Sequence, residues 1–233
     1  MQLLEYEAKR IFSKQGIPIP RSELIQSSEE LREVSDKLSF PAILKAQVPF
    51  GGRKKAGGVT VVHDQNDIEA GVRSLLGMRI RGCIVRKILL EEYMNTEREA
   101  YISVSIDASE GTPLILVSSE GGVDIEETTR IHPEKVVTRT VDIASGLSDD
   151  IATELARRLE LEGIPLEEIV GIVRRLYEIF VKYDALLVEA NPLVMTTERE
   201  LCAVGAAMTI DDDAVYRHPD LSLIHISEPT RPY

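Results

Sequence analysis

The sequence contains no tryptophan, and aromatic residues make up only 5% of its 233 residues. Such a chain offers few rings on which nucleic-acid bases could stack. It has no apolar run near the ~20 residues of a membrane span, and its first residues do not read as a secretory signal peptide. Lysines and arginines number 27 against 39 aspartates and glutamates, a net charge of −12. That balance disfavours nucleic acid and anionic membranes as partners, because phosphates are repelled at long range.

Cysteine and histidine are scarce as well. Cys83 and Cys202 lie far apart with apolar neighbours, so we expect buried thiols in a reducing compartment and no disulfide. The four histidines show no metal-ligand spacing. With 43% hydrophobic and 28% charged residues, the chain has enough apolar material for a core. We expect an acidic, cytoplasmic protein of one large domain or two small ones.

The C-terminal segment 221–233 stands apart from the rest. Through Arg231 its sequence resembles the translation of a transposase adapter used in making sequencing libraries. We therefore expect a non-native tail, leave it out of the fold prediction, and expect the natural protein to continue past Asp220.

Hydrophobic periodicity predicts the elements. The predicted helices cover residues 3–15, 27–38, 67–76, 148–159 and 166–183. The predicted strands cover residues 41–48, 59–62, 83–90, 99–107, 114–118, 135–141, 186–189 and 201–208. A tight turn at 119–126 leads into a short helix. Because strands dominate and many pair as hairpins, an α+β fold is favoured over a doubly wound sheet.

The segment 49–58 between two predicted strands holds four glycines and three cations in ten residues. It lacks the Gly-Lys-Ser/Thr ending of a Walker loop, and no helix follows it. Its glycines give access to backbone N–H groups, and Arg53, Lys54 and Lys55 supply positive charge. In a chain of charge −12, these cations close to Lys45 favour a phosphate site. A plain basic surface hairpin remains open.

Several predicted strands carry polar side chains where apolar ones would cost less free energy. They are Lys45, Glu91, Glu99, Glu189 and Asn191. Each alone also fits a solvated face or a sheet edge. However, Glu189 and Asn191 are two residues apart on one strand and so share a face. Oxygen ligands of this kind suit Mg²⁺ together with phosphate oxygens. The set predicts a Mg-nucleotide site without a Walker loop.

The order of short motifs resembles the N-terminal ATP-grasp domain of succinate–CoA ligase (succinyl-CoA synthetase) β subunits. The similar stretches are 4–9, 16–20, 45–48, 51–53, 55–59, 120–123, 189–194 and 217–221. The resemblance implies an α+β ATP-grasp fold of two subdomains over residues 1–220. A smaller lobe at about 21–95 would be inserted in the larger lobe. The family's CoA-ligase domain would follow, so the chain reads as a truncated N-terminal portion.

The resemblance also implies roles for individual residues. The implied nucleotide-binding residues are Lys45, Gly52, Arg53, Lys54, Glu91, Glu92, Met94 and Glu99. The lysine would contact the α- and β-phosphates, 52–54 would cover them, 91–94 would line the adenine along a hinge strand, and Glu99 would bind the ribose. Asn191 would be a Mg²⁺ ligand, and Glu189 would be the catalytic residue where a phosphohistidine arrives.

The implied reaction uses ATP and Mg²⁺ and involves a partner. The γ-phosphate would be exchanged with a phosphohistidine on an α subunit, within a heterodimer or heterotetramer. Coenzyme A would bind mainly outside this chain, and this truncated chain alone would be inactive. Pro20 is a weak hint of ATP over GTP. Succinate leads among the acids, with citrate, malate and acetate ligases using a similar domain.

The chain departs from the family pattern at two places. Lys54 stands where the family has the second glycine of Gly-Arg-Gly, which adds a charge and removes a residue free to take positive φ. Gly205 stands at the position of the family's second Mg²⁺ ligand, an aspartate, and Ala207 stands at that of a lysine. Two alternatives therefore stay open: a non-catalytic ATP-grasp paralogue that binds nucleotide or scaffolds a partner, and an ATP-grasp amide ligase.

Overall fold

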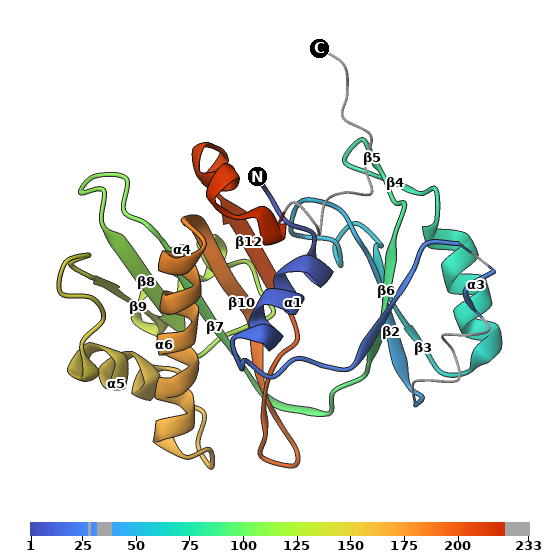
Figure 1. The fold of residues 1–233 in the computed structure, drawn as a ribbon. Coiled ribbons are helices and arrows are strands. Elements are labelled where there is room, and N and C mark those ends of the chain that lie inside the picture. The colour runs from blue at the N-terminus through green and yellow to red at the C-terminus, as the bar shows by residue number, and fades with distance from the viewer. Residues whose placement is uncertain (28, 32–38, 222–233) are drawn as a thin grey trace.

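The computed structural model describes residues 1–27, 29–31 and 39–221, which form two lobes side by side (Figure 1). The predicted helix at 27–38 and the predicted non-native tail at 221–233 fall largely outside the described residues. Each lobe has a hydrophobic core of its own. Among the described residues, no helix has both the length and the apolar character to span a bilayer.

The smaller lobe, at the right of Figure 1, is a four-stranded antiparallel sheet in the order β1-β6-β2-β3. Its strands are β1 (Ser22–Ile25), β2 (Ala42–Ala46), β3 (Val59–Val62) and β6 (Ile88–Glu92). Helix α3 (Gln65–Leu75) covers one face, where Leu44 and Leu90 pack with Ile68 and Val72. The opposite face of this sheet is therefore the one that carries Lys45 and Glu91.

A short hairpin, β4 (Arg79–Ile80) with β5 (Cys83–Ile84), precedes β6. The predicted single strand 83–90 is wrong at its middle. The Val85 amide donates to Met78 O and the Val85 carbonyl accepts from Gly77 N, both at 2.9 Å, so the chain there pairs with the preceding turn. Cys83 is half-buried and Cys202 is buried, so the burial prediction holds for one thiol.

The larger lobe contains an antiparallel sheet in the order β11-β10-β7-β8-β9, with β12 paired to β10. Its strands are β7 (Thr96–Ile106), β8 (Pro113–Ser118), β9 (Val136–Thr140), β10 (Ala185–Thr196), β11 (Leu201–Ala203) and β12 (Ala206–Ile210). The helical elements are α1 (Glu5–Lys14), α4 (Ile125–Ile131), α5 (Asp149–Arg158), α6 (Leu166–Lys182), and the 3-10 turns η1 (Pro133–Lys135) and η2 (Asp212–Arg217).

Helices α1, α5 and α6 pack on one face of this sheet and build the larger core. Their apolar stripes meet every second residue of the strands, so Ala100, Ile102 and Val104 are fully buried against them. The residues between these, such as Tyr101 and Ser103, lie on the other face.

The predicted strand 201–208 is also divided in the structure. Val204 N and Gly205 N both donate to Pro192 O, at 3.0 and 3.2 Å, which interrupts regular pairing. As a result β11 pairs with the end of β10 and β12 pairs with its beginning. The predicted strand 186–189 is correspondingly too short, because β10 continues to Thr196.

Candidate phosphate and nucleotide site

Lys45 lies on β2 on the face turned away from α3, and it is only 7% exposed. Its ammonium group donates to Glu91 Oε1 at 2.5 Å, to Val204 O at 2.8 Å and to Glu5 Oε1 at 3.3 Å. An ammonium group has three N–H donors, so each has an acceptor in the protein. These bonds offset the cost of burying a charge inside a strand.

Lys45 belongs to a group of buried charges, here called the interlobe charge cluster: Glu5, Lys9, Lys45, Arg53 and Glu91. Glu5 and Lys9 come from α1 of the larger lobe, Lys45 and Glu91 from the small sheet, and Arg53 from the hairpin 49–58. Lys9 pairs with Glu91 and lies 3.1 Å from Glu5, while Arg53 Nη2 lies 2.5 Å from Glu5 Oε2. Three cations face two carboxylates, so the cluster keeps one surplus positive charge.

Burial and pairing oppose each other within the interlobe charge cluster. Burial alone would raise the pKa of Glu5, but Lys45, Lys9 and Arg53 hold it far below its usual value. Burial lowers the pKa of Lys45, yet Glu5 and Glu91 raise it above its ordinary value. For Lys9, burial and the Lys45 charge prevail, and its pKa is lowered. Glu5 is therefore ionised at neutral pH.

The hairpin 49–58 reaches from the small sheet toward the larger lobe. Gly52 has φ of +74°, and Gly58 N donates to Arg53 O at 2.8 Å, which closes the turn. The charge of Lys54 acts on Glu99 of β7, and Lys55 Nζ lies 3.8 Å from Asp124 Oδ2. Of the predicted phosphate-covering residues, Arg53 and Lys54 thus face carboxylates of the larger lobe, while Gly52 lies near Arg81 of the smaller lobe.

The end of β6 and the linker 93–95 that follows it hold the predicted adenine contacts. The side chain of Glu91 is fully buried and directed to Lys9 and Lys45. Glu92 accepts from Arg21 Nε at 2.9 Å, and its backbone N–H donates to Arg21 O. Met94 is half-buried. The two glutamate side chains are thus engaged within the protein. An open groove of about 830 Å³ is lined by α1 residues, Pro20, Arg21 and Leu89, and not by residues 91–95.

The glycine turn at 121–122 fits closely against β7 and β10. A Cβ atom on Gly121 would lie 2.3 Å from Ala100 O, and one on Gly122 would lie 2.2 Å from Glu99 Oε2. Gly122 N donates to Asn191 Oδ1 at 2.8 Å, and Asn191 Nδ2 donates to Val123 O at 3.2 Å. The turn therefore orients the amide of Asn191 and places it near Glu99.

Glu189 lies on the same strand as Asn191. Its Oε2 accepts the Tyr101 hydroxyl at 2.8 Å. Burial raises the pKa of Glu189, and the hydrogen bonds from Tyr101 and Asn191 counteract part of that rise. Burial and the charge of Glu189 raise the pKa of Tyr101 far above its usual value, so its hydroxyl stays a donor. Burial likewise raises the pKa of Glu99, against the charge of Lys54.

The side-chain oxygens of Asn191 and Glu189 fit a Mg²⁺ ion that also binds phosphate. Asn191 Oδ1 has a second lone pair, and Glu189 has a second carboxylate oxygen. Within the described residues no group of three or more His, Cys, Asp or Glu forms a cage. Gly205 has no side chain and so supplies no carboxylate. A Cβ there would lie 1.9 Å from Asn191 O, so no larger residue fits at this position. Mg²⁺ accepts one or two protein oxygens with phosphates and water.

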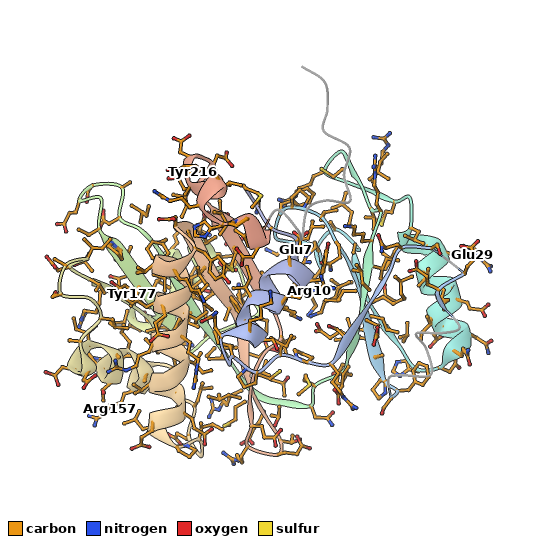
Figure 2. All side chains as sticks on the ribbon, in the orientation of Figure 1. Glu7, Arg10, Glu29, Arg157, Tyr177 and Tyr216 are labelled. Carbon is orange, nitrogen blue, oxygen red and sulfur yellow. The ribbon has the colours of Figure 1, made fainter. Side chains whose placement is uncertain are left out.

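Three residues of the site had no assigned role in the sequence analysis: Glu5, Lys9 and Tyr101. Figure 2 shows α1, marked by Glu7 and Arg10, between the two lobes. The available signal was the i,i+4 pair of opposite charges on α1 and a tyrosine alternating with apolar residues on β7. Neither signal names the partners, because Glu5 and Lys45 are 40 positions apart.

The chain is similar to one known protein family and to several named proteins. A family described as an ATP-grasp domain matches residues 2–195. The succinate–CoA ligase [ADP-forming] subunit β of Aquifex aeolicus is 42% identical over 228 residues, which cover 95% of this chain and 58% of that protein. The Methanocaldococcus jannaschii protein of the same name is 39% identical over 218 residues, 94% of this chain and 59% of that protein. The chain thus spans under two thirds of these relatives.

Solved structures share the fold. An acetyl-coenzyme A synthetase of Ca. Korarchaeum cryptofilum, in complex with coenzyme A, acetyl-coenzyme A and a phosphorylated phosphohistidine segment, matches with a TM-score of 0.71 at 23% identity, covering 90% of this chain and 93% of that chain. ATP citrate lyase of Methanothrix soehngenii, with citrate and coenzyme A, matches with a TM-score of 0.72 at 18% identity, covering 100% and 55%. The predicted α+β architecture is confirmed.

Proposed function

The chain belongs to the ATP-grasp family, and we propose that it is the nucleotide-binding part of the β subunit of an ADP-forming succinate–CoA ligase. One observation carries the proposal. Lys45 and Arg53 converge on a single carboxylate, that of Glu5, in the space between the two lobes. Two cations that already share one anion are suited to share a phosphate. The names of the relatives that are 39–42% identical support the choice of ligase.

Each side chain has a separate task in this proposal. Lys45 and Arg53 bind the phosphates, with the N–H groups and charge of Gly52 and Lys54 above them. The main chain of the linker, including Met94, binds the adenine, since the side chains of Glu91 and Glu92 are engaged elsewhere. Glu99 binds the ribose hydroxyls. Phosphoryl transfer depends on such positioning and charge neutralisation more than on covalent chemistry.

Asn191 and Glu189 supply the side-chain oxygens at which Mg²⁺ would bind. When bound, Mg²⁺ neutralises the phosphate charge and orients the transferred group. Glu189, fixed by Tyr101, receives the histidine of a partner α subunit and orients its ring for phosphorylation. We propose that the α subunit supplies this histidine and that coenzyme A binds mainly outside this chain. We also propose that the protein acts in the cytoplasm.

A second candidate function is a nucleotide-binding paralogue without catalysis. It is favoured by Gly205, which provides no metal-binding carboxylate and leaves no room for one at that position. The proposed ligase compensates with phosphate oxygens and water around Mg²⁺. An amide ligase has less support, because the relatives with high coverage are named as succinate–CoA ligases.

Activity of the full-length protein with its α subunit tests the proposal. With succinate, coenzyme A, ATP and Mg²⁺, we expect succinyl-CoA and a phosphorylated histidine on the α subunit. Lys45→Ala is expected to lose most of this activity. Lys182→Ala, which removes an exposed cation at the end of α6, is the matched control and keeps most of it. Nucleotide binding without any acyl-CoA formation would instead support the paralogue.

A further inference from the structure

Glu5 is a buried carboxylate between the two cations that we propose bind the phosphates, and phosphate binding alone does not require an anion there. It contacts both cations proposed for the phosphates: Oε1 lies 3.3 Å from Lys45 Nζ, and Oε2 lies 2.5 Å from Arg53 Nη2. Its side chain is 1% exposed. It is supplied by α1 of the larger lobe, whereas both cations belong to the smaller one. Glu5 therefore occupies the position between the lobes at which the two cations meet.

Lys45 can bind a phosphate only by giving up a partner. Its three N–H groups already have acceptors in Glu91, Val204 and Glu5. The contact to Glu5 is the longest of the three, at 3.3 Å against 2.5 and 2.8 Å. When it is broken, Glu5 keeps Lys9 at 3.1 Å. Glu5 is thus the partner that Lys45 exchanges at the least cost.

Arg53 leads to the same conclusion. Within the described part of the chain, its charged partner is Glu5, and its other contact is a long hydrogen bond of 3.4 Å to Ala46 O. The Nη2–Oε2 approach is an ion pair and not a hydrogen bond, because Glu5 Oε2 has no hydrogen-bond partner among the described residues. Arginine can bind a phosphate through a planar pair of donors, so an anionic ligand would offer Arg53 hydrogen bonds that Glu5 does not.

We propose that Glu5 is a specificity-determining residue, an internal anion that a phosphate chain must displace from Lys45 and Arg53 in order to bind. The inference rests on the proposed function, since it takes these two cations as phosphate ligands. A single phosphate replaces one anion with another and gains little. A chain of two or three phosphates contacts more donors and carries more charge than one carboxylate. The site thereby selects polyphosphates over inorganic phosphate.

The substitution Glu5→Gln in the full-length protein tests this role, because it keeps the side chain's shape and removes its charge. Calorimetry at low salt measures the Kd of inorganic tripolyphosphate and of inorganic phosphate. We expect tripolyphosphate to bind roughly tenfold more tightly to the variant, and inorganic phosphate to gain more than that. Discrimination between the two ligands then falls, and unchanged or increased discrimination would overturn the specificity role.

Glu7→Gln is the matched control, because Glu7 is on the same helix and is 1% exposed. Its carboxylate accepts from Leu4 N at 2.8 Å and from the Tyr6 hydroxyl at 3.0 Å. Both of these contacts are at the start of α1, and we expect both Kd values to stay as in the wild type. A gain of the Glu5→Gln size in Glu7→Gln would overturn the specific role of Glu5.

The remaining outcomes separate this inference from the proposed function. If the wild type binds tripolyphosphate and Glu5→Gln binds it equally or more weakly, the internal-anion role is wrong and the proposed function stands. If the wild type binds neither tripolyphosphate nor Mg-ATP, the proposed function is wrong as well. Should Glu5→Gln fail to fold, Glu5→Asp takes its place. Its shorter side chain reaches Arg53 less well, so tripolyphosphate should bind about threefold more tightly, and no gain overturns the role.

Discussion

At the scale of single residues, Glu91 is one of the two carboxylates that hold the interlobe charge cluster together. It is fully buried and pairs with both Lys9 and Lys45. Glu91→Gln leaves these cations short of a counterion, and breaking a buried pair costs about 3 kcal/mol. We expect a loss of that size in the free energy of unfolding, measured by urea titration.

The neighbouring residue offers the control. Glu92 pairs with Arg21, whose side chain is 67% exposed, and exposed ion pairs contribute about 1 kcal/mol or less. Glu92→Gln is therefore expected to change the free energy of unfolding little. Equal losses in the two variants would contradict the role given to burial.

Tyr101 controls the protonation of Glu189. The Tyr101 hydroxyl donates to the carboxylate at 2.8 Å and lowers its pKa against the effect of burial. Tyr101→Phe removes that donor, so the pKa of Glu189 should rise further. A ¹³C NMR titration of the glutamate carboxyl groups measures the shift. Tyr177→Phe on α6 is the control and should leave the Glu189 titration where it was.

Stability in acid depends on Glu5. Its pKa in the folded protein lies far below the ordinary value of 4.5, so the native state binds its proton less readily than the unfolded chain. The stabilisation is complete above about pH 4.5 and is lost as the pH falls below it. The free energy of unfolding, followed by urea titration from pH 6 to 3, should fall less steeply in Glu5→Gln than in the wild type. Parallel profiles would show that Glu5 does not titrate in this way.

At the scale of elements, the glycine turn at 121–122 positions the side chain of Asn191, the proposed Mg²⁺ ligand. A Cβ at Gly121 would lie 2.3 Å from the backbone oxygen of Ala100, which cannot move without disturbing β7. Gly121→Ala should cost about 2 kcal/mol or more of stability, as overpacking typically does. Gly51→Ala has open space around it and should change the unfolding midpoint little. Thermal or urea unfolding compares the two.

The elements also show which parts of the fold the sequence could predict. Amphipathic helices such as 166–183 and the strand 59–62 were predicted nearly to the residue, because their periodicity is a local property. The divisions at Val85 and at Val204–Gly205 were missed, because backbone bonds to residues outside the segment cause them. Pattern alone cannot register such partners.

The same limit applies to the site. Lys45, the cationic hairpin and the pair Glu189 and Asn191 could be singled out, since each contradicts the chemistry expected of its own segment. The link from Glu5 to Lys45 could not, because it joins two lobes across 40 positions. The roles in nucleotide binding remain predictions, and each has its own substitution above.

At the scale of the whole molecule, the charges are unevenly placed. The chain carries −12 overall, while the interlobe charge cluster keeps one surplus positive charge in the space between two separate cores. Binding of Mg-ATP at this place would add contacts to both lobes, so it should raise the thermal unfolding midpoint. A nucleoside without phosphates is expected to raise the midpoint far less. An equal rise would mean that the base and ribose, and not the phosphates, provide most of the binding free energy.

The most direct measurement is calorimetric titration of the protein with ATP, with and without Mg²⁺, for the wild type and for Lys45→Ala. We predict one site that binds Mg-ATP more tightly than metal-free ATP, and a loss of affinity of at least roughly tenfold in Lys45→Ala. Equal affinities of the two proteins for Mg-ATP, or no preference of the wild type for the metal complex, would contradict a phosphate site built on Lys45, Arg53 and Asn191.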